Sequence, residues 1–248
     1  MMKAYREMLK TEARLSLRGM DMLIFAVMMP LVVLVALGVI YGTKPAFEGA
    51  EYTFLEQSFG ALASIAICAG GVMGLPLVIS DYREKHILKR FQVTPVKPSL
   101  LLFVQISIYI LYAAVSLVTL FVCAVLFFDL RIQGSVLQFL LGWILVMFSM
   151  FCLGIMVGGV AKNSKSAGVL ASILYFPMLI FSGATLPYEI MPSGMQKVAD
   201  IMPLTQGIKI LKASILGLPV GNVLPSICIL LIVAVICLGV AIRLFKWE

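Results

Sequence analysis

Charged residues are scarce in this sequence. Only 12% of its 248 residues are Asp, Glu, Lys or Arg, while 62% are hydrophobic. A soluble domain has about 25% charged and about 45–50% apolar residues. One water-soluble globule of this length could not bury so much apolar surface. The composition therefore excludes an ordinary soluble fold and indicates lipid as the solvent.

Residues for enzyme chemistry are also few. His86 is the only histidine, so a serine in an apolar stretch has no histidine base nearby. The sequence contains no G-x-S-x-G motif, no H-E-x-x-H motif and no G-x-x-x-x-G-K-[ST] phosphate loop. We therefore predict that the chain has no catalytic residues and does not hydrolyse ATP by itself.

The cysteines do not predict a disulfide framework either. There are five, and an odd count excludes a disulfide network that uses all of them. All five fall inside apolar stretches, which is typical of small buried side chains. Since the single histidine is distant from them in sequence, we predict no metal site.

What the sequence has in abundance is long apolar stretches. About 20 residues cross the hydrocarbon layer as a helix, and six stretches meet that need. The first follows no cleavable leader pattern, so we expect it to be retained. The predicted spans are Met22–Tyr41, Phe59–Ile79, Leu100–Phe128, Val136–Val160, Gly168–Leu186 and Val223–Phe245.

None of the six span cores carries a charged residue or a histidine. Charges within lipid usually mark ion or proton relays, so their absence argues against a proton- or sodium-coupled pump and against a channel with a charged ring. We predict an all-α membrane protein, residues 1–248 forming one transmembrane domain. It has an N-terminal interfacial helix and short re-entrant outer helices before the last span.

The basic residues predict the orientation. Fourteen of the 19 lie on the side that holds both termini and five on the other side. The positive-inside rule therefore places both termini in the cytoplasm of a multi-pass cell-membrane protein. The net charge of +7 is thus a topology signal and a contact for lipid headgroups, and we expect no nucleic-acid partner.

Residues 1–21 are expected to form an interfacial helix in the headgroup plane. Apolar residues repeat every four positions, and a basic stripe runs beside them. The alternative is an ordinary juxtamembrane helix that only anchors the chain. The apolar stripe consists of Tyr5, Leu9, Ala13 and Leu17, and the basic stripe of Arg6, Lys10, Arg14 and Arg18.

The connection at residues 80–99 mixes charges with apolar residues at helical spacing. Ile87, Leu88 and Phe91 share one side, and Pro95 and Pro98 stop the helix. An amphipathic helix beyond the membrane favours docking to a partner protein. A solvated charged turn lying on lipid is the alternative.

Residues 187–222 form a long outer connection with two helix-like segments. We predict that Ser193 caps a helix ending before Pro203, and that Thr205 caps a second one ending at Gly217. The second is too apolar for open water and too short to span. Both helices are expected to dip partly into the bilayer.

Small residues indicate where helices approach closely. Two G-x-x-x-G motifs occur, one with Gly70 and Gly74 and one with Gly154 and Gly158. Kinks or span ends are expected at Pro30, Pro76 and Pro177.

Two stretches resemble the type-2 ABC exporter permease family. The first contains Arg83-Glu84, Ile87-Leu88-Lys89-Arg90 and Val93-Thr94-Pro95, and is similar to that family's charged inner helix with its terminal "TP" pair. The second contains Phe181-Ser182-Gly183-Ala184, Leu186-Pro187, Met191-Pro192 and Pro203-Leu204-Thr205, and is similar to its "SGA…P…P…PLT" run. One departure is His86-Ile87, where many members have a small or glycine-containing turn.

The resemblance implies partners and roles. The chain would pair with a second copy, as a homodimer, or with a similar permease, and two cytoplasmic ABC ATPase subunits would bind the pair. ATP and Mg²⁺ would sit on those subunits, with no cofactor in this chain. ATPase docking is implied for the interfacial helix and for Tyr82, Arg83, Glu84, His86, Leu88, Lys89 and Arg90. An outer gate is implied at Gly183, Pro187 and Pro203.

The function that follows is export of a hydrophobic or amphiphilic client, such as a drug, antibiotic, lipid or glycolipid. Two rivals stay open: a membrane scaffold or resistance protein without a transport cycle, and a secondary exporter. An ATPase that co-purifies with the chain would favour the first function over the scaffold. Transport that survives ATP depletion but not loss of the proton gradient would favour the secondary exporter.

Overall fold

The computed structural model describes residues 2–19, 23–42, 44–46, 49–50, 52–87, 89, 98–183, 188, 191–219, 221 and 223–244. Over these residues the chain is helical, with one isolated bridge between Pro45 and Thr53 and no strand. The elements are α1 (Met2–Gly19), η1 (Ile24–Met28), α3 (Met29–Tyr41), α4 (Phe54–Cys68), η2 (Ala69–Gly74), α5 (Leu75–Glu84), α7 (Pro98–Phe128), α8 (Val136–Val160), α9 (Ser164–Phe181), α10 (Ser193–Ile201), α11 (Pro203–Leu216) and α12 (Leu224–Leu244).

The predicted six-span, all-α fold is confirmed. Six helices are long and apolar enough to cross a membrane, and each overlaps one predicted stretch. The second is longer than predicted, because α4, η2 and α5 run on as one helix from Phe54 to Glu84. The six are Ile24–Tyr41, Phe54–Glu84, Ser99–Phe128, Val136–Val160, Ser164–Phe181 and Leu224–Arg243.

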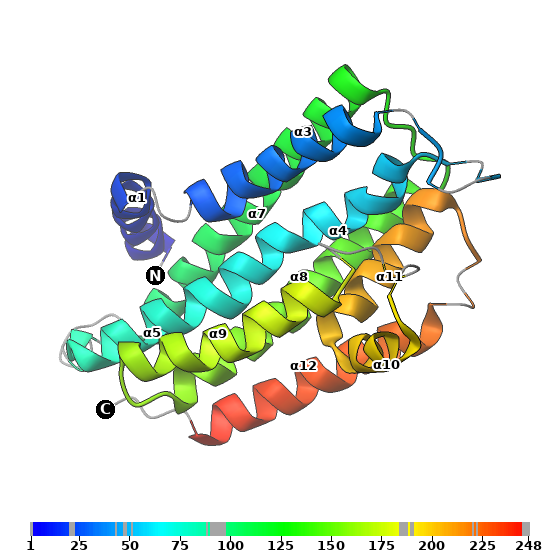
Figure 1. Ribbon diagram of the computed structural model, residues 1–248. Helices are drawn as coiled ribbons and strands as arrows, with labels where there is room; N and C mark the ends of the chain where they lie inside the picture. The colour runs from blue at the N-terminus through cyan, green and yellow to red at the C-terminus, as the bar shows by residue number, and fades with distance from the viewer. Residues whose placement is uncertain are drawn as a thin grey trace.

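The second span lies at the centre of the bundle and is mostly buried. It contacts α3, α7, α8, α9 and α11, while α12 packs along α8 (Figure 1). Both termini lie at one end of the bundle, here named the terminal end, and α10 and α11 lie toward the opposite end, the far end (Figure 1). The helix α1 crosses the terminal end and packs on α7.

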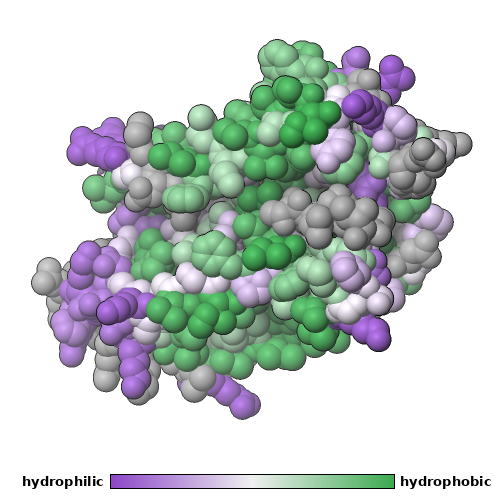
Figure 2. Space-filling model, viewed as in Figure 1, coloured by the Kyte–Doolittle hydropathy of each residue, from purple (hydrophilic) through white to green (hydrophobic). Residues whose placement is uncertain are grey.

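An apolar region covers the middle of the visible face of the bundle. Figure 2 shows hydrophobic residues along the spans and hydrophilic ones gathered at both ends. Many of the exposed side chains on α3, α7, α8 and α12 are large and apolar, for example Val39, Leu126 and Val235. Such a surface is stable only against hydrocarbon, which accounts for the six spans as membrane-crossing elements.

Two of the three span prolines follow a π-helical segment. Pro30 is the second residue of α3, which follows η1, and Pro76 is the second residue of α5, which follows η2, whereas Pro177 lies inside α9. Proline lacks the N–H that would continue the helical bonding, so a widened turn is one way to accommodate it. Pro30 and Pro76 therefore lie next to local departures from α geometry within their spans.

The predicted close approach at the second glycine motif is confirmed. A Cβ added to Gly154 would overlap the carbonyl oxygen of Gly71, and one added to Gly158 would come within 3.1 Å of the Cα of Pro76. The helix α8 thus packs backbone to backbone against η2 and α5. In the first motif, a Cβ added to Gly70 would lie 3.3 Å from the ring of Tyr109, which is a side-chain contact.

The far-end helices exist as predicted, but their predicted caps are wrong. Neither Ser193 nor Thr205 is an N-cap: each lies inside its helix, and the N-cap positions are Pro192 and Met202. Pro203 itself begins α11, since its fixed φ suits a first helical position and it has no N–H to satisfy. The predicted end is confirmed, with Gly217 in the left-handed region at φ 66°.

Candidate functional site

A polar cluster joins α1 to two spans at the terminal end. The Tyr82 hydroxyl donates to Glu12 Oε2 at 3.0 Å, and Gln105 Nε2 donates to the same oxygen at 2.8 Å. Gln105 Nε2 also lies 2.6 Å from the Tyr82 hydroxyl. We name Glu12, Tyr82 and Gln105 the terminal-end triad. It connects α1, α5 and α7 through a single carboxylate.

The two faces of α1 have different roles. Tyr5 and Ser16 reach α7, with hydroxyl contacts of 2.7 Å to Ser107 and 2.9 Å to Tyr112. The predicted basic stripe faces away from the bundle and is exposed along its whole length. Its members are Arg6, Lys10, Arg14 and Arg18. A helix with a packed face and a basic outer face is suited to headgroups or to an acidic partner surface.

Arg83 and Glu84 contact neighbouring helix ends. Arg83 Nη1 donates to the carbonyls of Gly159 at 2.8 Å and Ala161 at 3.0 Å, where α8 ends. A cation there satisfies carbonyls that have no helical partner and favours the helix dipole. The Glu84 carboxylate accepts from the backbone N–H of Ser164 at 2.9 Å, at the start of α9. Both residues therefore contact neighbouring helices, Arg83 half-buried and Glu84 exposed.

Of the four remaining predicted docking residues, the structure describes His86 and Lys89. Lys89 is exposed, and His86 is exposed with φ 54°. That value lies in the left-handed region that favours glycine, which agrees with the glycine-containing turn that many members of the resembled family have here. Leu88 and Arg90 lie outside the described residues.

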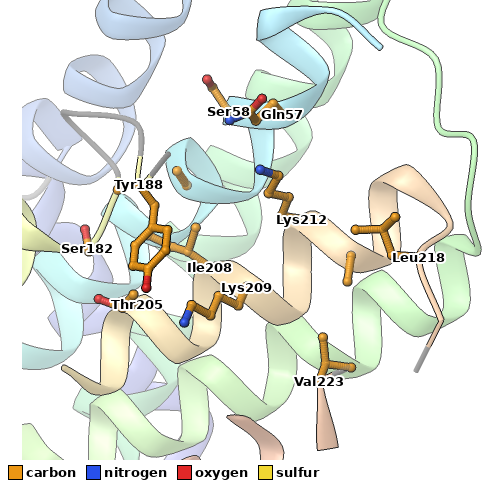
Figure 3. Close-up of a pocket in the computed structure, with 13 residues that line it drawn as sticks. Gln57, Ser58, Ser182, Tyr188, Thr205, Ile208, Lys209, Lys212, Leu218 and Val223 are labelled. Carbon is orange, nitrogen blue, oxygen red and sulfur yellow. The ribbon is translucent and has the colours of Figure 1, made fainter. Parts of the chain in front are cut away.

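The far end contains an open pocket of about 260 Å³ (Figure 3). Polar side chains from α4 and α11, together with Ser182 and Tyr188, line it. The apolar lining comes from α4, α11 and the connection between α11 and α12. Gly183, one of the predicted gate residues, lines it with φ 88°, and Pro203 begins α11 beside it. Pro187 lies outside the described residues. The polar lining consists of Gln57, Ser58, Ser182, Tyr188, Thr205, Lys209 and Lys212.

An ion pair borders this pocket. Lys209 Nζ lies 2.6 Å from Asp200 Oδ1 and 4.7 Å from the centre of the Tyr188 ring. The Tyr188 hydroxyl donates to the same carboxylate at 2.9 Å. Partial burial acts to raise the pKa of Asp200, but the hydrogen bonds from Lys209 and Tyr188 outweigh it and hold that pKa below its usual value. Asp200 is therefore a carboxylate at neutral pH.

A buried carboxylate caps the second span at the far end. Glu56 is 4% exposed, and it forms a capping box with Thr53, whose N–H donates to Glu56 Oε2 at 2.8 Å. Its other oxygen accepts from the backbone N–H of Arg131 at 3.3 Å. One side chain thus fixes both the start of α4 and the α7–α8 connection.

Glu56→Ala should destabilise the protein by about 2 kcal/mol, because two backbone donors lose their charged acceptor. Glu56→Gln keeps an acceptor oxygen and should retain most of the stability. The thermal unfolding midpoint in detergent measures both, with Glu7→Ala as the control at an exposed glutamate. Equal midpoints for Glu56→Ala and Glu7→Ala would contradict this assignment.

Comparison with known families agrees with this architecture. Residues 3–216 match the ABC-2 type transporter family, a range that contains α1, the first five spans, α10 and α11. The chain belongs to the ABC-2 type transporter family. The suspected resemblance to ABC exporter permeases is confirmed at the level of this family.

Two curated relatives of this ABC-2 chain are membrane or nodulation proteins. It is 27% identical over 132 residues to the inner membrane transport permease YhhJ of Escherichia coli K12, an alignment covering 53% of this chain and 35% of that protein. It is 30% identical over 94 residues to nodulation protein J of Rhizobium leguminosarum bv. viciae. That alignment covers 38% of this chain and 36% of the nodulation protein. The chain thus spans about a third of the length of each relative.

In this ABC-2 chain the site residues predicted from the sequence fall into two groups, which lie at opposite ends of the helix bundle. Tyr82, Arg83 and Glu84 lie at the terminal end together with α1, and Gly183 and Pro203 lie at the far end. Sequence reasoning missed the partners that complete each group. They are Glu12 and Gln105 at the terminal end, and Gln57, Ser58, Tyr188, Thr205, Lys209 and Lys212 at the far end.

Proposed function

We propose that this chain is the membrane-spanning subunit of an ATP-driven exporter that moves a hydrophobic or amphiphilic client out of the cell. The observation that carries the proposal is the ABC-2 family match over residues 3–216. Two cytoplasmic ABC ATPases would bind a dimer of the chain, and ATP and Mg²⁺ would sit on those ATPases. The terminal end would face the cytoplasm, in line with the basic residues there.

The distribution of charge supports an external energy source. Among the described residues of the six spans, every charged side chain stands near an end of its helix. They are Glu56, Asp81, Arg83, Glu84, Lys165 and Arg243. A proton or sodium relay needs titratable groups at membrane depth, so the energy for transport is proposed to come from the partner ATPase. Reconstituted alone in liposomes, the chain should move no client uphill.

The docking surface is proposed to lie on the exposed part of the terminal end. Tyr82 and Arg83 are half-buried with partners inside the bundle, so they position the surface more than they form it. The exposed residues there are Glu84, Lys85, His86 and Lys89, and the four basic residues of α1 are exposed at the same end. ATPase motion would reach the spans through α1 and α5.

Lys89→Glu should lower the recovery of an ABC ATPase with the tagged chain about tenfold, which corresponds to about 1.4 kcal/mol. Reversing a rim charge places like charges opposite each other at the interface. Recovery is measured by mild-detergent pull-down from native membranes. Lys197→Glu is the matched control, because Lys197 is exposed on α10 at the far end.

Three outcomes would count against parts of this proposal. Equal ATPase recovery with both variants would refute docking at Lys89. Absence of any ABC ATPase even with the unmodified chain would favour a scaffold without a transport cycle. Transport that continues without ATP and collapses with the proton gradient would indicate a secondary exporter.

A further inference from the structure

We infer that a groove between α1 and α7 binds one anionic phospholipid, with an acyl chain in the groove and the phosphate between Arg14 and Arg18. Such a lipid would belong to the membrane around the chain, so its binding goes beyond the proposed function and requires neither an ATPase nor a client. Three features support it: the lining of the groove, the direction in which the groove runs and the two arginines at its edge.

The groove is an apolar cavity of about 140 Å³ at the terminal end, and we name it the α1–α7 groove. Tyr112 is the one described lining residue with a polar atom in its side chain, and its hydroxyl is already bonded to Ser16 at 2.9 Å. A cavity without free polar groups does not hold water and takes up hydrocarbon instead. The other lining residues are Ala13, Leu17, Leu23, Ile108, Leu111 and Val115.

The α7 side of the groove is a single helix face that leads into the membrane. Ile108, Leu111, Tyr112 and Val115 are three or four residues apart and extend about 10 Å along the helix. Leu111 is 57% exposed and Val115 44% exposed, so the groove is open to the hydrocarbon layer along this face. Since α7 runs from the terminal end to the far end (Figure 1), the groove has the direction of an acyl chain whose headgroup lies at the terminal end.

Two arginines stand at the edge of the groove. Arg14 and Arg18 each follow a lining residue of α1 by one position, are exposed, and are neighbours on one side of the helix. Within the described parts of the chain, neither has an ion pair or a hydrogen bond. The carboxylate of Glu12, close to them in sequence, is bonded instead to Tyr82 and Gln105. Two guanidinium groups without an internal acceptor are suited to a phosphate, which they bind through paired N–H donors.

A phospholipid fits this place better than an acidic protein segment does. An acidic peptide would satisfy Arg14 and Arg18, but its backbone would leave polar groups unpaired in a groove that is open to hydrocarbon. A phospholipid meets both demands with one molecule, because its phosphate lies at the polar end of the bundle while its chain lies among apolar side chains. The α1–α7 groove is therefore assigned to a lipid.

The test measures lipid binding to the purified full chain by native mass spectrometry in a neutral detergent. The probes are dioleoyl phosphatidylglycerol, dioleoyl phosphatidylcholine with the same chains, and inorganic phosphate. Phosphatidylglycerol should bind about tenfold more tightly than phosphatidylcholine, and replacing both Arg14 and Arg18 by alanine should remove that difference. Inorganic phosphate should not bind at concentrations that saturate the site with phosphatidylglycerol.

Lys3→Ala combined with Arg6→Ala is the matched control for charge. It removes two exposed cations from the same helix, and Arg6 lies about 12 Å before Arg14 along the helix axis. The affinity of this variant for phosphatidylglycerol should stay close to that of the unmodified chain. Equal weakening by the two double variants would reduce the effect to general surface charge and overturn the site.

A second pair of variants tests the acyl chain. Val115→Phe adds a ring to the groove and should weaken phosphatidylglycerol binding, whereas Val118→Phe adds the same ring to α7 outside the groove. Both positions are exposed, so both variants should fold. Equal affinity in the two variants, or equally tight binding of inorganic phosphate, would refute the acyl-chain contact.

The lipid site and the proposed function fail separately. If the variant without Arg14 and Arg18 keeps its preference for phosphatidylglycerol but recovers less ABC ATPase in the pull-down, these arginines belong to a protein interface and the lipid site is refuted. If no ABC ATPase is recovered with the unmodified chain while the lipid results are as expected, the exporter proposal is refuted and the lipid site stands.

Discussion

Gly154→Ala should leave very little folded protein in the membrane. The added methyl group would overlap the carbonyl oxygen of Gly71, a backbone atom that cannot rotate away. Overpacking of this kind typically costs about 1–3 kcal/mol and sometimes more. Because even about 1–2 kcal/mol changes cellular abundance several-fold, we expect the monodisperse peak in size-exclusion chromatography to fall at least about fivefold.

Gly239→Ala provides the matched control in another span. A Cβ at Gly239 has nothing within 4 Å, and alanine is favoured over glycine in a helix by about 1 kcal/mol. This variant should therefore be as abundant as the unmodified chain. If Gly154→Ala were equally abundant, the backbone contact between α8 and η2 would be refuted. Gly158→Ala should be intermediate, since its nearest neighbour is the Cβ of Ile79 at 3.0 Å.

The spans were predictable because hydropathy is a local property of the sequence. The ends of the second span were not, since they depend on partners far away in the chain. Glu56 looks like a residue outside the membrane until Arg131 supplies a backbone donor to it. Arg83 looks like an exposed docking cation until the end of α8 supplies carbonyl acceptors. Neither contact can be predicted from the residues that neighbour Glu56 or Arg83 in the sequence.

The predicted sites were incomplete for a similar reason. Glu12 stands among basic residues and gives no local sign of facing inward, and Gln105 is one of several polar residues in a mostly apolar span. At the far end, a serine and a threonine were given the roles of caps from their propensities alone. A proline at the start of α11 fixed that boundary instead, and Thr205 lies inside the helix, where it lines the pocket.

Glu12→Ala should release α1 from the spans while the six-span bundle stays folded. Its carboxylate accepts hydrogen bonds from both Tyr82 and Gln105, and a hydrogen bond to a charged group contributes about 1.5–3 kcal/mol. Loss of these bonds should raise the hydrogen-exchange rate of α1 amides about tenfold or more, because local opening becomes easier. Tyr82→Phe removes one of the two donors and should have a smaller effect.

Glu7→Ala separates this effect from a general change in helix charge. Glu7 is on the exposed face of α1 and pairs with Lys10 at 3.2 Å on the surface, where an ion pair contributes about 0–1 kcal/mol. In Glu7→Ala, the hydrogen-exchange rates of the α1 amides should stay close to those of the unmodified chain. If Glu12→Ala and Glu7→Ala exchange alike, the triad does not hold α1. The Glu12→Ala variant also tests whether ATPase motion reaches the spans through α1. If α1 opens more easily and the partner ATPase still binds, transport should fall in this variant. Unchanged transport would refute coupling through α1.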